Sequence, residues 1–360
     1  MRQAVRLTPA DNFSVPQKMS DTSAPIAAAP LRQVSSPFVY VIVLNWNSPQ
    51  MTADCVRSLL AMAGTGFRVV VVDNGSRNDS AEFLQRTFSE ISVIANGSNL
   101  GFAGGCNVGM RRALEEGADY VLLVNNDTIV DRYLLRELIG QAEAEPRVGI
   151  LSPKIYYADP ADLLWWAGGT FNIWIGLADH IARRRKDVGD HNHGRDLDWA
   201  TGCVMLLRCE ALSKAGLFDE QIFAIGEDVD LSLRMKKAGY TVRYVPTARL
   251  WHREGAETRK SAGQHVRIFL MVRNLLWVMH KHARAYHWVT FLPFFLFYYL
   301  PKMMILNLSR GDFRSCGAML EGVVAFCRMI WSPGASVLPP ELSGAAIPRT
   351  PERIAADDVT

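Results

Sequence analysis

Closely paired cysteines are missing from this chain. Its 360 residues include six cysteines, and none forms a C-x-x-C pair. This spacing excludes the common cysteine-based zinc and dithiol motifs, so the histidines of the tract 191–193 have no cysteine at ligand spacing. We therefore predict reduced thiols in a cytosolic compartment.

A signal sequence and a long apolar span are missing as well. Residues 1–36 have no apolar core, and like residues 332–360 they have the composition of a disordered tail. The uncharged run 288–300 is shorter than the about 20 residues of a transmembrane helix. Pro293 lies within this run and Pro301 follows it, and both are expected to interrupt a helix here. The net charge of +3 gives no reason to expect nucleic acid as a partner.

The chain does contain enough apolar material for a large core. Hydrophobic residues make up 49% of the sequence and charged residues 21%. Between residues 37 and 150, apolar runs typical of buried strands alternate with stretches of helical spacing. This order predicts an α/β fold with a parallel sheet and right-handed crossovers. The expected strands are 38–46, 68–73, 91–96 and 120–125, and the expected helices are 52–62 (capped by Thr52), 80–88 and 103–116.

The character of the chain changes after residue 150. Residues 150–260 are less regular and richer in Gly, Trp and charge, and we expect them to complete one domain, 37–260, as its substrate-binding half. They include the basic tract 183–186. Such a tract is typical of a solvated loop, or of a contact with an anionic lipid-linked acceptor or membrane lipid.

The region 261–331 is predicted to be helical and membrane-associated. Its first helix carries Arg267, Asn274 and Lys281 on one stripe, because they are seven residues apart. With the aromatic run that follows, this pattern favours a segment, 265–309, that lies in a membrane interface. A buried helical hairpin, a homodimer contact and a membrane span are the alternatives.

The segment Asn125-Asn126-Asp127 is the most informative local feature. It follows an apolar run, so a buried strand would deliver the Asp127 carboxylate to the carboxyl edge of the sheet, where open α/β sheets bind ligands. Carboxylate oxygens suit Mg²⁺ or Mn²⁺, and such an ion neutralises a diphosphate leaving group. The alternative is that Asp127 only caps the next helix.

Two further polar features follow apolar stretches later in the chain. His252 follows the run 244–251 and is either a metal ligand or a structural residue. Glu227, Asp228 and Asp230 stand at a predicted helix start, after a glycine that lets the backbone approach a ligand. A carboxylate there can act as general base for an acceptor hydroxyl, or it can be an ordinary partner of the helix dipole.

Asp73 and a glycine-rich loop complete the set of candidate residues. Asp73 ends the second predicted strand, where a carboxylate can accept a hydrogen bond from a nucleotide base or ribose. The loop that begins at Asn99 opens a helix, and Gly101 and Gly104 let its backbone approach a phosphate. This loop lacks the lysine of a P-loop, and no G-x-G-x-x-G follows the first strand, which argues against a dehydrogenase.

Taken in order, these segments resemble the glycosyltransferases of family 2, which have the GT-A fold, and in particular their bacterial rhamnosyltransferase-like branch. The resemblance runs from Val39 to Asn274. It implies a mostly parallel mixed sheet flanked by helices. The matching segments are VIVLNWN, VVVVDNGS, NLGFAGGCNVG, VNNDT, DWATGCVMLLR, GLFDEQIFAIGEDVDLSLRMKKAGY and a later H-x-x-G.

The resemblance also implies roles for individual residues. Asp127 and His252 would bind the metal, and Asp228, with Glu227 beside it, would be the catalytic base of a single inverting displacement. Asp73 would recognise the nucleotide base. Two positions depart from the family pattern, because Asn125 replaces an acidic residue and Cys203 replaces a small one. The full nucleotide-sugar set is Asn45, Asn47, Asp73, Asn99, Gly101, Gly104, Asn125 and Asn126, and the acceptor set is Trp199, Gly202 and Cys203.

The predicted function is inverting transfer of L-rhamnose from dTDP-rhamnose to a lipid-linked or polysaccharide acceptor, in cell-surface glycan synthesis at the cytoplasmic face of the bacterial plasma membrane. A UDP-sugar donor (galactofuranose, galactose or glucose) is the alternative within the same fold, since thymine and uracil differ by one methyl group. The alternative from another class is a catalytically silent nucleotide-sugar-binding scaffold. The presence of Asp127, Asp228 and His252 argues against it.

Overall fold

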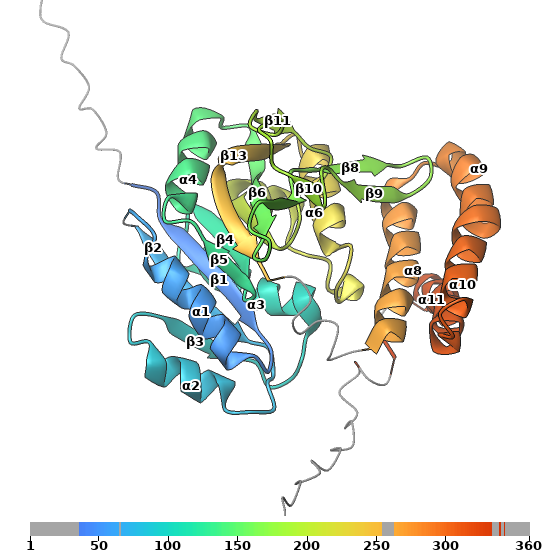
Figure 1. Ribbon diagram of the computed structural model, residues 1–360, viewed down its shortest axis with the longest axis horizontal. Coiled ribbons are helices and arrows are strands. Elements are labelled where there is room, and N and C mark those ends of the chain that lie inside the picture. Colours follow the sequence, from blue (N-terminus) through green and yellow to red (C-terminus); the bar gives the residue numbers. More distant parts are fainter. Residues whose placement is uncertain (1–35, 65, 254–262, 333–337, 340–341, 343–360) are drawn as a thin grey trace, which may run out of the picture. The chain divides into compact units, whose positions relative to one another are not determined.

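The computed structural model describes residues 36–64, 66–253, 263–332, 338–339 and 342, and these belong to one compact unit that begins at Ser36. The predicted N-terminal tail, the predicted domain boundary at 261 and most of the predicted C-terminal tail lie outside the described residues. The centre of the unit is a mixed sheet (Figure 1). Helices α1 and α2 cover one face of its first half, and α3 covers the other.

The first half of the sheet is parallel, which confirms the sequence prediction. β1 pairs with β2 and with β4, and β2 pairs with β3, all in parallel. The apolar runs are continuous because helices bury both faces of these strands. Thr52 is not the cap of the first helix, which begins one turn earlier, after Ser48. The elements are β1 (Val39–Asn45), α1 (Pro49–Leu60), β2 (Phe67–Asp73), α2 (Ser80–Thr87), β3 (Ser92–Ala95), α3 (Gly101–Glu115) and β4 (Tyr120–Asn125).

The second half of the sheet mixes directions, and the sequence analysis assigned no strands to most of it. β12 lies antiparallel between β4 and β6, and β13 runs parallel to β6 and antiparallel to β5. The strands of this half are β5 (Thr128–Val130), β6 (Val148–Tyr157), β7 (Leu163–Trp166), β10 (Arg185–Lys186), β11 (Arg195–Asp196), β12 (Val204–Arg208) and β13 (Thr241–His252). A separate hairpin is formed by β8 (Gly169–Asn172) and β9 (Leu177–His180).

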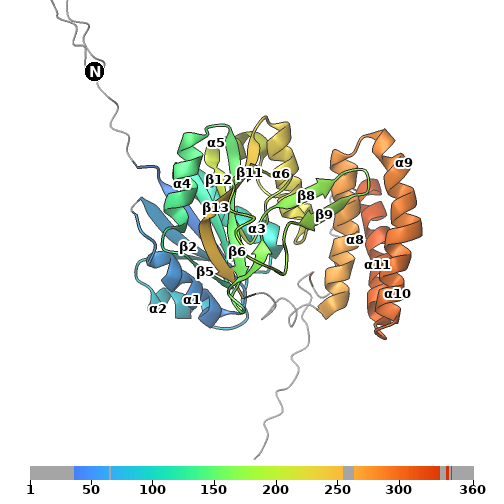
Figure 2. The ribbon, with the colours of Figure 1, turned by 45° about the horizontal axis from the view of Figure 1, so that its top comes forward.

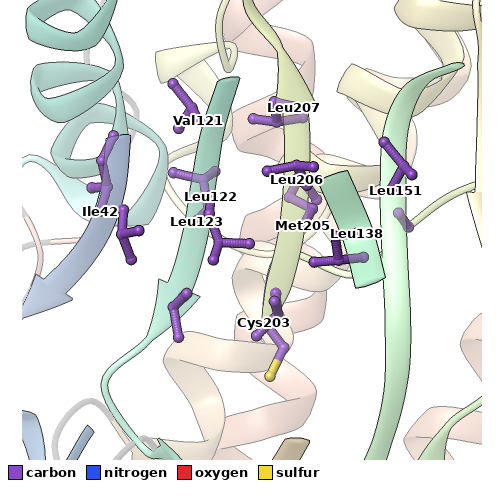
Figure 3. Close-up of a cluster of buried hydrophobic side chains, with 14 of the residues drawn as sticks. Ile42, Val121, Leu122, Leu123, Leu138, Leu151, Cys203, Met205, Leu206 and Leu207 are labelled. Carbon is purple, nitrogen blue, oxygen red and sulfur yellow. The ribbon is translucent and has the colours of Figure 1, made fainter. Parts of the chain in front are cut away.

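The core lies where the two halves of the sheet meet. Figure 3 shows its side chains extending from neighbouring strands and from α4 (Leu134–Ala144). Leu122 of β4 stands opposite Leu206 of β12, and both are fully buried, as are Ile42 and Leu151. Each such side chain stabilises the fold by about 1.5–3 kcal/mol. This packing fixes the end of β4, where Asn125 lies, and the start of β12, which follows Cys203.

The helices after the sheet lie in layers (Figures 1 and 2). α8 (Gly263–His282) packs on one side against α6 (Glu227–Lys237) and on the other against α11 (Phe313–Trp331). Eleven of the side chains of α8 are buried. The remaining helical elements are α5 (Cys209–Ala215), η1 (Glu220–Ile222), α9 (Ala285–Phe294), η2 (Phe295–Tyr299) and α10 (Leu300–Leu308).

The polar stripe of α8 does not face a membrane interface along its length. Asn274 is 1% exposed and Lys281 pairs with two aspartates, so only Arg267 of the stripe is exposed. The alternative of a buried helical packing therefore describes α8. This narrows the predicted membrane segment to the helices that follow α8.

The prolines do not interrupt the next helical segment, contrary to the sequence expectation. Residues 285–308 form one helical stretch, in which Pro293 is internal and Pro301 starts α10. The π turn η2 lies between them, where a wider turn accommodates a missing N–H donor. Within the described residues, this stretch is the one long and apolar enough to cross a membrane, with a mean hydropathy of 1.6.

Candidate active site

Polar residues end three neighbouring strands of the parallel half. Asn45, the last residue of β1, is in register with Asp73, the last residue of β2. Asn125, the last residue of β4, is in register with Leu44. Because carboxyl ends of parallel strands share one edge of a sheet, the structure brings these three predicted residues together.

A chain of hydrogen bonds runs along this edge. Asn45 Nδ2 donates to Asp73 Oδ2 at 2.6 Å, and the Thr52 hydroxyl lies 2.6 Å from Asn45 Oδ1. Asn126 Nδ2 donates to the same hydroxyl at 3.0 Å. Asp73 also accepts from the backbone N–H and the hydroxyl of Ser76, at 2.9 and 2.7 Å. The Asp73 carboxylate is therefore buried, fully ordered by its neighbours and aimed from a rigid strand end.

Asn47 supports the turn that follows β2. Its backbone lies in the left-handed region, with φ 58°, which asparagine adopts more readily than most residues. Its N–H donates to Ser76 Oγ at 2.8 Å, and its Oδ1 accepts from Arg77 N at 2.8 Å. The side chain of Asn47 is thus used to hold the turn, and its contact with a nucleotide stays a prediction.

The glycine-rich loop, for which the sequence predicts a phosphate contact, also lies against Phe223. A Cβ on Gly101, which has φ 75°, would lie 2.5 Å from the carbonyl oxygen of Phe223. Ala103 N, in the first turn of α3, donates to that same oxygen at 3.0 Å. Asn99 Oδ1 accepts from Gly101 N at 2.8 Å, and Gly104 is buried one turn later. The glycine at 101 is therefore required by Phe223, and the phosphate contact stays a prediction.

Strand pairing brings Asp127 and His252 together. β5 begins immediately after Asp127, and its first residue, Thr128, is in register with His252 of β13. Asp127 Oδ2 lies 3.1 Å from His252 Nε2, and His252 is 6% exposed. Asp127 Oδ1 and His252 Nδ1 are buried and have no hydrogen-bond partner among the described residues. Residues 125 apart in the chain thus form the pair that the sequence predicts.

The Asp127–His252 pair fits a divalent cation. Neighbouring ligands of octahedral Mg²⁺ lie about 3 Å apart, so Asp127 Oδ2 and His252 Nε2 are spaced to bind one ion. The unpartnered Asp127 Oδ1 is a further ligand atom. Within the described ranges, no cluster of three His, Cys, Asp or Glu side chains surrounds the pair. Such a small protein ligand set is typical of ions that also bind substrate phosphates.

Trp165 adjoins this pair, although the sequence analysis did not single it out. Its ring centre lies 4.5 Å from that of His252 in an edge-on contact, and its Nε1 is buried without a hydrogen-bond partner among the described residues. The guanidinium of Arg183 lies 5.9 Å over the Trp165 ring, so the basic tract 183–186 reaches the site through this tryptophan. The only signal was a Trp-Trp pair in an apolar run, which core packing explains equally well.

The acidic segment at the start of α6 divides into three environments. Asp228 is half-buried, and its carboxylate accepts from Gly202 N at 2.9 Å and from Val229 N at 2.8 Å. Glu227 is 6% exposed, and its Oε2 has no hydrogen-bond partner among the residues that the structure describes. Asp230 is fully buried in ion pairs. A structural role thus accounts for the burial of Asp230, but it does not explain why the Glu227 carboxyl group is buried with an unpartnered oxygen.

The two carboxyl groups at the start of α6 hold protons more tightly than usual. Burial raises the pKa of Asp228 to about 6, although two backbone N–H groups favour its charged form. Burial, and then the negative charge of Asp228, hold the pKa of Glu227 well above its ordinary range. Near neutral pH, Asp228 is therefore ionised but has appreciable proton affinity, which suits a general base.

The segment before β12 joins the strand end to the acidic pair. Asn125 N donates to Cys203 O at 2.8 Å, and the adjacent Gly202 donates to Asp228. Trp199 is buried, and its Nε1 donates to Thr170 O at 3.0 Å. Two of the three predicted acceptor residues therefore lie between the end of β4 and the acidic pair. Their contact with an acceptor stays a prediction.

Comparison with known proteins agrees with this geometry. A family model described as "Glycosyltransferase like family 2" matches residues 36–269. An N-acetylglucosaminyl-diphospho-decaprenol L-rhamnosyltransferase of Mycobacterium tuberculosis is 26% identical over 219 residues, which are 55% of this chain and 70% of that protein. A low-salt glycan biosynthesis hexosyltransferase of Haloferax volcanii is 22% identical over 237 residues, 65% of this chain and 73% of that protein.

Solved structures give the same fold. GalNAc-T7, solved with UDP, GalNAc and Mn²⁺, superimposes with a TM-score of 0.55 at 14% identity, over 68% of this chain and 48% of that one. At this identity the similarity shows the fold alone. The family model spans more than half of the chain and includes Asp73, Asp127, Asp228 and His252. The chain therefore belongs to glycosyltransferase family 2 and has the GT-A fold.

Proposed function

We propose that this glycosyltransferase moves L-rhamnose from dTDP-rhamnose to a lipid-linked or polysaccharide acceptor in bacterial cell-surface glycan synthesis, with inversion at the anomeric carbon. The sugar is supported by the mycobacterial relative, whose name specifies L-rhamnosyl transfer to a diphospho-decaprenol acceptor. The observation that supports this chemistry is the environment of Asp228. It is a half-buried carboxylate with a raised pKa, and Gly202 and Cys203 link it to the end of β4, just before Asp127.

The proposed reaction is a single displacement. The acceptor hydroxyl attacks the anomeric carbon of the donor, and a glycosidic C–O bond forms as the bond from that carbon to the diphosphate oxygen breaks. The nucleoside diphosphate leaves with the electron pair, and Asp228 takes the hydroxyl proton. Because one displacement inverts configuration, no covalent nucleophile is required.

The donor side is assigned to the carboxyl edge of the parallel strands. Asp73 accepts from the nucleotide base or ribose, and Asn45 and Ser76 hold its carboxylate in place. Asp127 and His252 would hold Mn²⁺ or Mg²⁺, which when bound neutralises charge on the leaving diphosphate. Orienting the donor in this way lowers the entropic cost of reaching the transition state.

The acceptor side is assigned to the residues around Asp228 and Trp165. Gly202 and Cys203 border the acidic pair, and Trp199 lies four residues before Cys203, within the predicted acceptor set. Arg183 brings a cation to the Trp165 side of the site, where an acceptor diphosphate would carry negative charge. These contacts support a lipid diphosphate as the carrier of the acceptor sugar.

The helices after α8 are the proposed membrane contact. Only 17% of the most apolar part of stretch 285–308 is buried, and α11 packs beside this stretch. We assign this surface to the cytoplasmic face of the bacterial inner membrane, where a lipid-linked acceptor would lie. A contact between two copies of this chain is the alternative outcome. The most exposed apolar side chains of these helices are Val289, Phe297, Ile305, Phe313 and Trp331, each at least 68% exposed.

The test is calorimetric binding of dTDP-rhamnose and UDP-galactose to the purified protein, with and without Mn²⁺, and in Asp127→Ala. We expect metal-dependent binding of dTDP-rhamnose that Asp127→Ala loses. A preference for UDP-galactose would replace the donor and keep the chemistry. No binding of either would overturn the proposed donor and favour a silent scaffold. Turnover is then followed as dTDP release with a synthetic N-acetylglucosaminyl-diphospho-polyprenol.

A further inference from the structure

The backbone before the acidic pair is held in an unfavourable conformation. Phe223 and Ile225 have φ of 63° and 70°, although neither is a glycine, and Gly226 has φ 103°. Left-handed backbone is costly for bulky and β-branched residues, so a neighbouring structure must hold it in place. This strained turn, 223–226, leads directly into Glu227 and Asp228.

Helix α8 supplies the groups that hold the strained turn. Asn274 Nδ2 lies 3.0, 2.7 and 2.7 Å from the carbonyl oxygens of Ile222, Ala224 and Ile225. The neighbouring Arg273 donates through Nη2 to Ile222 O at 2.8 Å and, through Nε, to Asn274 Oδ1 at 2.9 Å. Both side chains are 1% exposed, so their hydrogen bonds form away from bulk water.

Lys281 lies two turns after Asn274 on α8 and bridges the two ends of the segment 219–230, which contains the strained turn. Its Nζ lies 2.6 Å from Asp219 Oδ2, before the strained turn, and 2.7 Å from Asp230 Oδ1, after it. His282 Nε2 lies 2.8 Å from the same Asp230 oxygen. Trp277 Nε1 donates to Asp219 Oδ2 at 3.0 Å. One face of α8 thus contacts the segment at its start, its centre and its end.

Asp230 makes this arrangement depend on charge. Burial opposes its ionisation, but the hydrogen bond from His282 and the charges of Arg234 and Lys281 outweigh burial and hold the pKa of Asp230 below its usual range. Removing a cation from a fully buried carboxylate leaves charge uncompensated. A change at Lys281 is therefore transmitted to α6, two residues beyond Asp228.

We infer that α8 positions the acidic pair for catalysis, with Asn274 and Lys281 as positioning residues that act through the strained turn and Asp230. This rests on the proposed role of Asp228 as general base. Ordinary helix docking does not require two carbonyls of a strained turn and the Ile222 carbonyl before it as acceptors of one amide, nor a single ammonium shared by aspartates eleven residues apart. The donor residues Asp73 and Asp127 lie on other elements, so these contacts of α8 act on Glu227 and Asp228 and not on the donor residues.

The kinetic test compares Lys281→Gln, Lys281→Arg and Asn274→Asp with Lys214→Gln, a matched control. Lys214 also pairs with a carboxylate, but its partners, Glu210 and Tyr240, lie outside the segment 219–230. We expect Lys281→Gln and Asn274→Asp to lower kcat about 10–100-fold, with the donor Kd changed less than about 3-fold, because a misplaced base slows chemistry without weakening the donor. Lys281→Arg restores most of kcat, and Lys214→Gln leaves kcat unchanged.

Hydrogen exchange keeps the inference testable without turnover. Faster amide exchange confined to residues 219–230 in Lys281→Gln supports positioning, because this variant loosens the turn and not the whole fold. Exchange that rises equally across α8 and the sheet, wild-type kcat in Lys281→Gln, or equal losses in kcat and donor affinity would overturn it. Asp228→Asn separates the two claims, since its retained turnover removes the proposed base, whatever the α8 variants do.

Discussion

The hydrogen-bonded carboxylate of Asp73 and the buried oxygen atoms of Asp127 and Glu227 show two opposite ways of treating polar groups in one site. Around Asp73, the carboxylate oxygens receive hydrogen bonds from Asn45 and Ser76. Around Asp127 and Glu227, buried oxygen atoms have no partner among the described residues. An unpartnered buried polar group costs about 1–3 kcal/mol, so the second region is a place where a ligand stabilises the protein. The first region is a preformed frame.

The largest expected effect on turnover comes from a change at Asp228. Asp228→Asn keeps the shape of the side chain but removes its proton affinity, so turnover falls about 10²–10⁴-fold while donor affinity changes little. Steady-state kinetics and calorimetry measure the two quantities separately. Because ionised Asp228 is disfavoured by burial, the same variant also raises Tm at neutral pH. Wild-type turnover in Asp228→Asn would place the base elsewhere.

The next effect concerns the unpartnered atoms near His252. Asp127→Ala removes two carboxylate oxygens from the candidate cation site, so Mn²⁺ no longer strengthens donor binding and turnover drops about 100-fold. Calorimetric titrations with and without Mn²⁺ measure this loss. Asp162→Ala, at an exposed carboxylate that lies just before β7 and pairs with Lys186, serves as the control and keeps the metal response. An unchanged Mn²⁺ response in Asp127→Ala contradicts the assignment.

A change in the preformed frame around Asp73 is expected to have a smaller effect, which combines lower donor affinity with lower stability. Asp73→Ala leaves the donors of Asn45 and Ser76 without their acceptor, so donor affinity falls about 10-fold and Tm decreases as well. Calorimetry and thermal unfolding are the measurements. A loss of affinity without any loss of stability would mean that the network is not a preformed frame.

The pH dependence distinguishes the two regions further. A general base acts only when ionised, and the pKa of Asp228, the proposed base, is raised to about 6. We therefore expect kcat/KM to fall about tenfold for each pH unit below 6, whereas an unshifted aspartate would stay active to about pH 4. The linked stability has the opposite sign: the native state binds this proton more tightly than the unfolded chain, so its contribution is lost as pH rises from 4 to 6. A profile that is flat from pH 7 to 5 contradicts the assignment.

The smallest effect lies outside both regions. Phe297→Ser removes an exposed aromatic side chain from stretch 285–308 and weakens binding to anionic vesicles about 5-fold, as about 1 kcal/mol of lost apolar burial implies. Vesicle flotation measures this affinity. Val188→Ser, at another largely exposed apolar residue, outside the helices after α8, is the control. A fall in sedimenting mass with unchanged flotation would assign the surface to a dimer.

The fold was predictable where structure is local. Each strand of the parallel half follows from a continuous apolar run, and its partners follow from the alternation with helices, so residues 39–125 match the expectation closely. β6, β12 and β13 depend on pairings between distant segments of mixed composition, which leave no periodic signal. Directions in the second half of the sheet therefore had to come from the structure.

The site was predictable where function needs a particular residue type. Carboxylates after apolar runs led to Asp73 and Asp127, a carboxylate at a helix start led to Asp228, and the structure brings Asp127 to His252. The role of Asn274 left no such signal, because its partners are backbone carbonyls that any residue could supply. The sequence singled out Gly101 for a phosphate contact, and only the fold shows that Phe223 also lies against it.

The bridge from Asn125 to Cys203 has an evolutionary consequence. Seventy-seven residues separate these two positions, yet one backbone hydrogen bond joins them and Gly202 binds Asp228 directly. The excursion between them, which includes the β8–β9 hairpin and the basic tract, starts and ends at fixed points of the sheet. Changes confined to the β8–β9 hairpin and the basic tract would alter the proposed acceptor side while Asp127, the core strands and the acidic pair keep their places, so new linkages could arise without rebuilding the proposed catalyst.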